Sequence, residues 1–230
     1  MCGRYALNIT PNQLVRQFHL DREPPRFERY NIAPTQPVPA VRAREATPRE
    51  LTLLHWGLIP GWAKDASIGN RMINARSETI TSKPVFREAF QNRRCLLPAS
   101  GFYEWKKLAD GKRKQPMFIH MADGSPFGLA GVWEQWQEPG GNVIASCAVL
   151  TTNANEFMQP IHDRMPVIIA QTDYDRWLEP AGDESDRLQE LLRPCPSEAM
   201  AAHAVSPRVN NPRFDKSECM APTQEQGRLF

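Results

Sequence analysis

The sequence predicts a single α+β domain built on an antiparallel, barrel-like β-sheet with short flanking helices. Apolar runs of strand length recur at fairly regular spacing, and turn residues separate them. The chain has 21 prolines against 13 glycines, which favours many short elements joined by rigid turns. Neither an internal repeat nor a low-complexity linker is evident. We therefore expect one domain over residues 1–212 and a polar, mobile tail over residues 213–230.

The expected strands are short, and two pairs of them form hairpins. Asp110-Gly111 favours a tight turn between residues 101–107 and 115–121. Pro139–Gly141 separates a second pair, residues 127–136 and 143–151. The remaining expected strands cover residues 4–9, 38–42, 51–56, 94–98, 167–170 and 202–205.

Two helices have recognisable first residues. Thr10 is expected to cap the first, because Pro11 takes the first helical position and Gln13 completes a capping box. Ser82 is expected to cap a second helix beginning at Pro84. Two further helical stretches are expected at residues 172–178 and 186–192, and loops or turns at residues 21–29, 43–50 and 57–71.

Composition and charge narrow the possible functions. The net charge is only +2, so any nucleic-acid site must be a local patch. No apolar run reaches the roughly 18 residues of a membrane span, and no signal peptide opens the chain, so we expect a cytoplasmic protein, nucleoid-associated if bacterial. The five cysteines lack close pairing, which argues against disulfides and zinc. We expect no metal and no cofactor.

The N-terminus carries unusual chemistry. Removal of Met1 would leave Cys2 with a free α-amine beside its thiol. Such an amine, with a pKa of about 8, is nucleophilic near neutral pH, and a thiolate is a strong nucleophile. Together they can trap an aldehyde, because the amine forms an imine and the thiol closes a thiazolidine ring. The pair also suits an N-terminal nucleophile acting on an amide. An incidental residue at a frayed terminus is the alternative.

Two residues are candidates for proton transfer. Glu104 lies in an aromatic strand, where a partly desolvated carboxylate suits general acid–base catalysis. His162 lies in a rigid connection between Pro160 and Pro166, where an imidazole is held for proton transfer. The alternatives are a solvent-facing strand glutamate paired with a lysine, and a structural histidine.

Four more residues are candidates for binding. An amide such as that of Asn74 can fix a substrate oxygen, and Arg4 and Arg76 can grip phosphate. Trp62, in a glycine- and proline-rich loop, can stack on a base, although a core tryptophan is the alternative. Asn74 and Arg76 could instead be a turn cap and a surface charge. A phosphate-binding groove could also draw on Arg71, Arg87, Arg93, Arg94, Lys106 and Lys107.

Several segments together resemble the SRAP family of SOS response-associated peptidases, or abasic-site-processing proteins. They occur in the family's order along nearly the whole chain, to about residue 210. The matching segments are Met1–Arg4, Tyr30–Pro34, Trp56–Trp62, Ile73–Thr79, Arg94–Ala99, Gly101–Trp105, Ile161–Pro166 and Val205-Ser206. One departure is Ala63, which stands where a second aromatic often follows the loop tryptophan. A longer Lys64–Arg71 stretch then puts stacking at a duplex end in doubt.

The resemblance implies a specific activity. Members bind single-stranded DNA, or single/double-strand junctions, carrying an abasic site, and trap its aldehyde as a thiazolidine crosslink that shields the lesion. Carried over by position, Cys2 is the nucleophile, Asn74 positions the sugar or the amine, and Glu104 and His162 transfer protons. Arg4 and Arg76 would contact phosphates, and Trp62 would pack against a base. A monomer is expected, since no amphipathic dimer stripe is evident.

Two alternatives stay open. A cysteine-type peptidase or autopeptidase would use Cys2 as nucleophile with His162 or Glu104 as its base. A non-covalent single-strand-binding protein would bind DNA in a manner that high salt abolishes.

Overall fold

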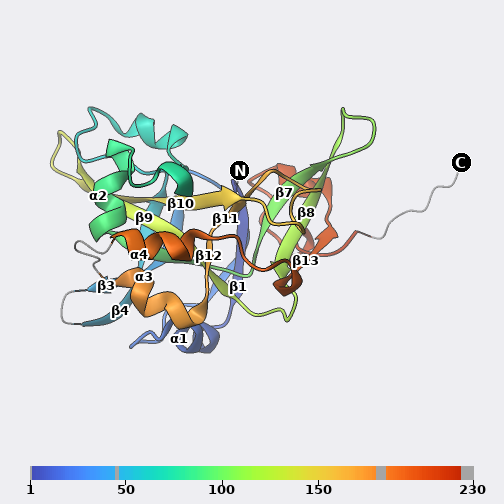
Figure 1. Ribbon diagram of the computed structural model, residues 1–230, viewed down its shortest axis with the longest axis horizontal. Helices are drawn as coiled ribbons and strands as arrows, with labels where there is room; N and C mark the ends of the chain where they lie inside the picture. Colours follow the sequence, from blue (N-terminus) through green and yellow to red (C-terminus); the bar gives the residue numbers. More distant parts are fainter. Residues whose placement is uncertain (1, 45–46, 180–184, 224–230) are drawn as a thin grey trace, which may run out of the picture.

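The computed structural model describes residues 2–44, 47–179 and 185–223, and it has the expected α+β architecture (Figure 1). Strands are the main regular structure of the described chain, and the helices are short. The strands are β1 (Tyr5–Ile9), β2 (Phe27–Ile32), β3 (Pro37–Arg44), β4 (Thr47–Trp56), β5 (Asn74–Arg76), β6 (Arg94–Ala99), β7 (Gly101–Lys107), β8 (Lys114–Met121), β9 (Phe127–Gln137), β10 (Val143–Asn153), β11 (Arg164–Pro166), β12 (Ile168–Ile169) and β13 (Met200–Ala204).

One sheet closes into a barrel. Its strands follow the order β10-β4-β3-β6-β9, and β9 pairs again with β10. Most of these pairs are antiparallel, as the sequence predicts. Strand β10 differs, because it runs parallel to both β4 and β5. The strands of this sheet supply much of the main apolar core, which includes the buried Leu54, Leu96, Leu129 and Val149.

The second sheet carries the N-terminal strand. Its order is β13-β8-β7-β1-β2, and every neighbouring pair is antiparallel. The predicted hairpin around Asp110-Gly111 is present as β7 and β8. Strand β1 lies between β7 and β2, so residues far apart in sequence flank the start of the chain.

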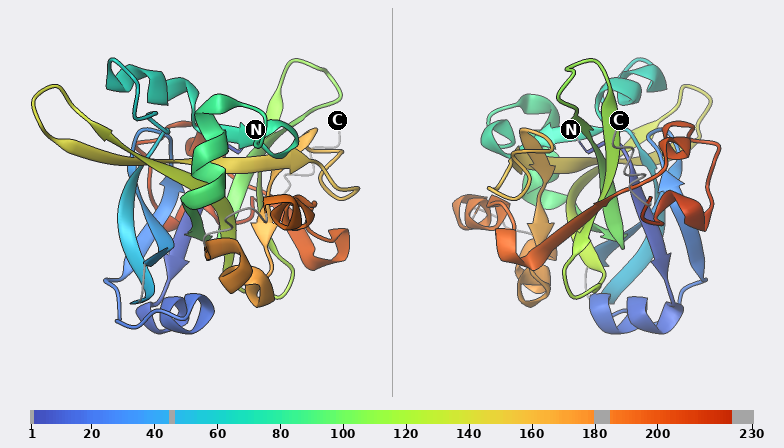
Figure 2. Two further views of the ribbon diagram at one scale, coloured as in Figure 1. Left: turned by 60° about the vertical axis from the view of Figure 1, so that its left-hand side comes forward. Right: turned by 90° about the vertical axis from the view of Figure 1, so that its right-hand side faces the viewer.

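The helices lie outside the strands (Figure 2). Helix α1 follows β1 and lies at the bottom of all three views. The α-helices are α1 (Pro11–Phe18), α2 (Pro84–Asn92), α3 (Tyr174–Leu178) and α4 (Ser185–Gln189). The 3₁₀-helices are η1 (Ala66–Arg71), η2 (Ser77–Thr79), η3 (Gln171–Asp173), η4 (Glu190–Leu192), η5 (Ser197–Ala199), η6 (Pro207–Asn210) and η7 (Ser217–Cys219).

The capping predictions had mixed outcomes. The capping box of α1 is present, with the Gln13 N–H donating to Thr10 Oγ1 at 3.3 Å and the Thr10 N–H to Gln13 Oε1 at 3.0 Å. The Ser82 cap is wrong, because Lys83 is the N-cap of α2 and makes no side-chain cap bond. Part of the expected loop at residues 57–71 is also helical, since Asp65 caps η1.

Some predicted loops are shorter than expected. Strand β2 begins at Phe27, inside the expected loop at residues 21–29. Strands β3 and β4 extend into the expected turn at residues 43–50. In both places pairing with a neighbouring strand, β2 with β1 and β3 with β4, outweighs the turn-like composition.

The segment expected to start a mobile tail is packed up to Thr223. Cys219 is buried, and Val205, Val209 and Phe118 share its small apolar cluster. Residues 224–230 lie outside the described residues, so the expected mobility there stays a prediction.

Three further findings concern the cysteines, possible metal ligands and the length of the helices. All five cysteines are free and buried. Among the described residues, no group of three or more His, Cys, Asp or Glu side chains is placed to hold a metal ion. None of the helices in the described part of the chain is long and apolar enough to cross a lipid bilayer.

Candidate active site

Backbone pairing between β1 and β7 brings Glu104 to Cys2. Tyr5 pairs with Phe102 in antiparallel register. The same register continued along β7 places Glu104 across from Gly3, the neighbour of Cys2. Both Cys2 and Glu104 are buried. The two residues are far apart in sequence, so this proximity depends on the strand order of the second sheet.

Asn74 reaches the same place from the barrel. It begins β5, which is held in parallel register on β10 opposite Val149. The preceding carbonyl, of Ile73, accepts a hydrogen bond from Trp56 Nε1 at 2.9 Å. Asn74 Nδ2 then donates to the Cys2 carbonyl oxygen at 2.9 Å. Its Oδ1 is buried and has no hydrogen-bond partner among the described residues, so it can accept a bond from a ligand.

His162 completes the group from the connection before β11. Its Nε2 lies 3.9 Å from Glu104 Oε2. Its Nδ1 accepts the backbone N–H of Arg164 at 3.0 Å, and it also lies 2.8 Å from Asp163 Oδ1. A neutral ring with the proton on Nε2 suits the Arg164 contact, and a protonated ring suits the Asp163 contact. The imidazole therefore has a partner in both protonation states.

Sequence analysis did not assign a function to Arg164 and Glu78, which support this site. The buried Arg164 guanidinium binds the Glu78 carboxylate through two bonds of 2.6 and 2.9 Å. It also donates to Asn153 Oδ1 at 2.8 Å and to the Thr151 carbonyl at 2.7 Å. Both charged residues lie in segments that carry the family resemblance. That position was the available signal, but their pairing is a tertiary contact.

Burial changes the acidity of the Cys2 thiol. Desolvation is the largest cause and the nearby Glu104 carboxylate acts in the same direction, and the pKa of the thiol is raised to about 12. The thiol is therefore protonated at neutral pH. A backbone N–H at Arg4 stabilises the thiolate but does not offset the burial.

Arg4 is held mainly by protein groups. Its Nη1 donates to Asn31 Oδ1 at 2.7 Å and to the Val209 carbonyl at 2.6 Å, and its Nη2 donates to the Asn210 carbonyl at 3.3 Å. The guanidinium also lies 6.0 Å from the centre of the Trp105 ring. These contacts give Arg4 a structural function, and a phosphate contact by Arg4 stays a prediction.

Trp62 and Arg76 both face solvent. The Trp62 side chain is 68% exposed, so the alternative of a core tryptophan is wrong. Its loop is anchored, because Trp136 Nε1 donates to the Ala63 carbonyl at 2.7 Å. Arg76 is the last residue of β5, the strand that Asn74 begins. Its side chain is exposed and forms no ion pair within the described part of the chain. Neither residue is joined by a described hydrogen bond to the buried Cys2 group.

One of the additional cations is unavailable for a groove. Arg94 is buried and donates to the carbonyls of Trp177, Phe90, Gln91 and Glu179, so the expectation that it lines a phosphate-binding groove is wrong. Arg93 pairs with Glu134 at 2.6 Å and Glu88 at 3.1 Å, and it lines a hollow together with Trp62. A phosphate contact by Arg93 stays a prediction.

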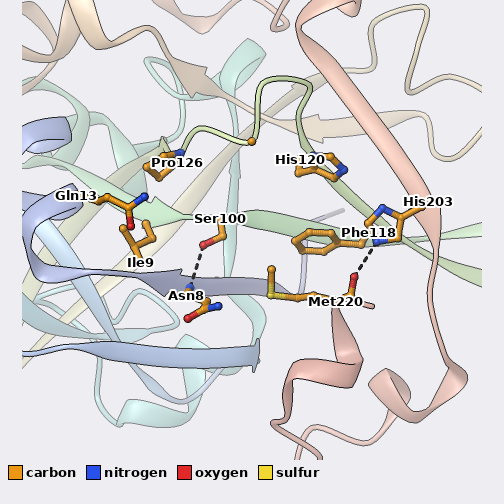
Figure 3. A pocket seen from close by; sticks show the side chains of 10 residues that line it. Asn8, Ile9, Gln13, Ser100, Phe118, His120, Pro126, His203 and Met220 are labelled. Atoms are coloured by element: carbon orange, nitrogen blue, oxygen red, sulfur yellow. Dashed lines mark hydrogen bonds between the residues drawn. The ribbon is translucent and has the colours of Figure 1, made fainter. Parts of the chain in front are cut away.

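A separate hollow lies at the other end of β1 (Figure 3). Its volume is about 300 Å³, and Asn8, Phe118, His120 and His203 are among the residues that line it. None of the predicted site residues does. The hollow is thus distinct from the group formed by Cys2, Asn74, Glu104 and His162, and we name that group the Cys2 site.

Comparison with known proteins agrees with the order of these segments. The family described as SOS response associated peptidase (SRAP) matches residues 1–212. The chain belongs to the SRAP family. Within this SRAP protein the four residues of the Cys2 site all lie inside the matched region, whereas the packed chain continues to Thr223.

Similar SRAP proteins include two from Bacillus subtilis. The abasic site processing protein YoaM is 44% identical over 96% of this chain and 97% of its own length. YoqW, which has the same description, is 42% identical over 95% of this chain and 98% of its own length. A mouse relative, the abasic site processing protein HMCES, is 27% identical over 96% of this chain and 76% of its own length.

Solved structures share the fold. A Bacteroides thetaiotaomicron protein superposes with a TM-score of 0.84, at 24% identity over 97% of this chain and 100% of its own. A Bordetella bronchiseptica protein gives a TM-score of 0.76, at 29% identity over 89% of this chain and 100% of its own. The predicted fold class is confirmed.

Proposed function

We propose that this SRAP protein binds abasic sites in single-stranded DNA and crosslinks to them through the mature N-terminal Cys2. The observation that supports this most directly is the arrangement of the Cys2 site. A buried cysteine, an amide with an unpartnered oxygen, a carboxylate and an imidazole meet at the start of the chain. Relatives named abasic site processing proteins support the choice of substrate.

The first step is assigned to the amine rather than the thiol. Removal of Met1 frees the α-amine of Cys2, whose ordinary pKa near 8 leaves a useful fraction unprotonated at pH 7. The thiol is largely protonated at this pH, because its pKa is raised to about 12. The amine nitrogen attacks the aldehyde carbon of the open sugar, and the carbonyl oxygen takes up a proton. Loss of water then gives an imine.

The thiol acts in the second step. Its sulfur adds to the imine carbon, the S–H proton leaves, and the imine nitrogen gains a proton, which closes the thiazolidine. Glu104 lies across from Gly3, the neighbour of Cys2, and we assign it as the base for this step. Its carboxylate disfavours the free thiolate, but it can accept the proton as the C–S bond forms.

His162 and Asn74 have supporting functions in this proposal. His162 can supply and recover a proton, since either state of its ring has a partner at Nδ1. Its Nε2 faces Glu104, so proton transfer between them needs only a small approach from 3.9 Å. Asn74 Oδ1 is free to accept from the Cys2 amine or a sugar hydroxyl. Arg76 and Trp62, whose side chains are exposed, are proposed to contact a phosphate and a base outside the Cys2 site.

The test uses the mature protein and an oligonucleotide with one abasic site, read on a denaturing gel. The native protein is expected to give a heat-stable shifted band, and Cys2→Ala none. Cys2→Ser is the matched control, because its hydroxyl is closest in size and polarity to the lost thiol. Both variants keep the α-amine, so each is expected to give a band only after borohydride reduction of the imine. A heat-stable band from Cys2→Ala would exclude the proposed linkage.

A peptidase activity is the second candidate, and the family description favours it. It would use the same Cys2 nucleophile with Glu104 or His162 as base. Turnover of a peptide pool by the purified protein, lost in Cys2→Ala, would support this activity. Absence of turnover together with crosslinking would favour the DNA reaction alone.

A further inference from the structure

Residues 207–216, which we name the C-terminal strap, pack on the face of the second sheet that carries Tyr103 and Trp105. Arg4, two residues after Cys2, donates to the strap carbonyls of Val209 and Asn210. Trp105, next to Glu104, donates from Nε1 to Asn210 Oδ1 at 2.7 Å. The strap therefore contacts residues that lie two positions from Cys2 and one position from Glu104 in the sequence.

The strap is held firmly on β2. The buried Asn31 donates from Nδ2 to strap carbonyls of Val209, Asn211 and Phe214 at 3.1, 3.0 and 2.9 Å. Asp215 accepts the Asn31 N–H at 2.8 Å and pairs with Arg29 Nε at 2.6 Å. These bonds hold the backbone of the strap in place, and the Arg29 guanidinium balances the charge of the Asp215 carboxylate.

The outer face of the strap is basic. Arg208, Arg213 and Lys216 are all exposed, and none of them forms an ion pair within the described residues. The Arg208 guanidinium and the Lys216 ammonium lie 5.6 and 6.0 Å from the centre of the Phe214 ring, so one aromatic side chain orders both cations. Glu218 follows the strap and contacts the Ser217 hydroxyl at 3.4 Å.

We infer that the strap binds phosphates of the single strand that enters the Cys2 site. Two cations ordered on Phe214, together with the exposed Arg213, lie on the segment that contacts Arg4 and provide charge complementary to a DNA backbone, in a protein whose net charge is only +2. Fixed backbone attachment means that little conformational entropy is lost when the strand binds. This inference rests on the proposed function for its substrate class, but it concerns binding and not the covalent step.

The test measures binding of a short, undamaged single-stranded oligonucleotide at several salt concentrations. The variant is Arg208→Gln/Lys216→Gln. The matched control is Arg16→Gln/Arg22→Gln, which removes the same charge from exposed arginines near α1, at the far end of β1 from Cys2. Each phosphate contact contributes about 0.7 to the slope of log affinity against log salt for a single strand. The strap variant is expected to lower that slope by about 1.4, and the control to leave it unchanged.

The outcomes separate this inference from the proposed function. If the strap variant and the control have the same affinity and slope, or if the native protein does not bind the oligonucleotide, the inference is overturned. If binding falls as expected but no abasic crosslink forms with the native protein, the proposed chemistry fails while the strap assignment stands. Circular dichroism and melting of both variants check that each is folded.

Discussion

At the scale of single residues, burial of Cys2 determines the order of the proposed reaction. A cysteine that attacks first needs a lowered pKa, and exposed or electropositive surroundings provide it. Cys2 has the opposite environment, because it is buried beside a carboxylate. A protonated thiol at neutral pH is consistent with a second-step nucleophile. The unpartnered Asn74 Oδ1 then has a function in holding the amine or sugar for the first step.

This order predicts the pH dependence of crosslinking. The thiol pKa is raised to about 12, so the thiol stays protonated from pH 6 to pH 9 and adds no change in that range. The amine, with an ordinary pKa of about 8, loses its proton within the range. The rate constant is therefore expected to rise about tenfold per pH unit at low pH and to level above about pH 8.

The measurement is single-turnover crosslinking at saturating abasic oligonucleotide, with rates taken from denaturing gels. A rate that keeps rising tenfold per pH unit through pH 9 would contradict the amine-first order. The extent of the reaction at each pH separates a slower reaction from a smaller fraction of active protein.

At the scale of elements, the Arg164–Glu78 pair joins the two segments that deliver Asn74 and His162. Glu78 lies in η2 directly after β5, and Arg164 begins β11. Hydrogen bonds from Arg164 hold the pKa of the Glu78 carboxyl below its usual value. A group with a lowered folded-state pKa stabilises the fold above its unfolded pKa, and this stability is lost as pH falls through the folded value.

Glu78→Gln should therefore remove part of the acid dependence of stability. At pH 7 the variant is expected to be less stable by about 1 kcal/mol, a modest value because the Glu78 side chain is 40% exposed. As pH falls below the lowered pKa of the native Glu78 carboxyl, the two proteins should converge, because the native side chain is then also neutral. Urea unfolding at several pH values tests this.

Glu190→Gln is the matched control. It removes the exposed carboxylate that pairs with Arg176, away from the Cys2 site. Its unfolding curve at pH 7 should stay near that of the native protein. Equal destabilisation by both substitutions would show that the position of Glu78 has no special structural importance.

At the scale of the whole molecule, the C-terminal segment closes the second sheet over the start of the chain. Asn31 and Arg4 bind the strap, and Cys219 is buried in the small cluster behind it. The family match ends at residue 212, but the packing does not. The segment that carries Cys2 is thus held in part by the other end of the described chain, through Arg4.

Two truncations test this packing. Ending the chain after Pro212 removes Asp215 and Cys219, and it leaves part of the buried Asn31 amide without a partner. This variant is expected to lose at least about 3 kcal/mol of stability, or about 6–12 °C in melting temperature. A chain that ends after Thr223 keeps every described contact. Its melting temperature should equal that of the full-length protein. Equal melting of all three proteins would contradict the assignment.

Local signals in the sequence predicted much of the fold. The capping box of α1, the hairpin around Asp110-Gly111 and most strands were correctly placed, because each depends on residues close together in the chain. The Ser82 cap was misplaced by one residue. The predicted loops at residues 21–29 and 43–50 were too long, because strand pairing outweighed local preference there. Glu104 and His162 were candidates from their sequence context, but each alone had a plausible structural explanation, and the family resemblance favoured the functional one.

The sequence by itself determined the fold class, the family and the chemical types of the candidate residues. Only the tertiary structure decided which of them meet. Glu104 faces the neighbour of Cys2 through the register of β1 with β7, and Arg4 binds a strap from the far end of the chain. Such contacts depend on the order of strands in a sheet and on burial within a shared core. Neither property can be read from the neighbouring residues, because long-range pairing is set by the packing of the whole molecule.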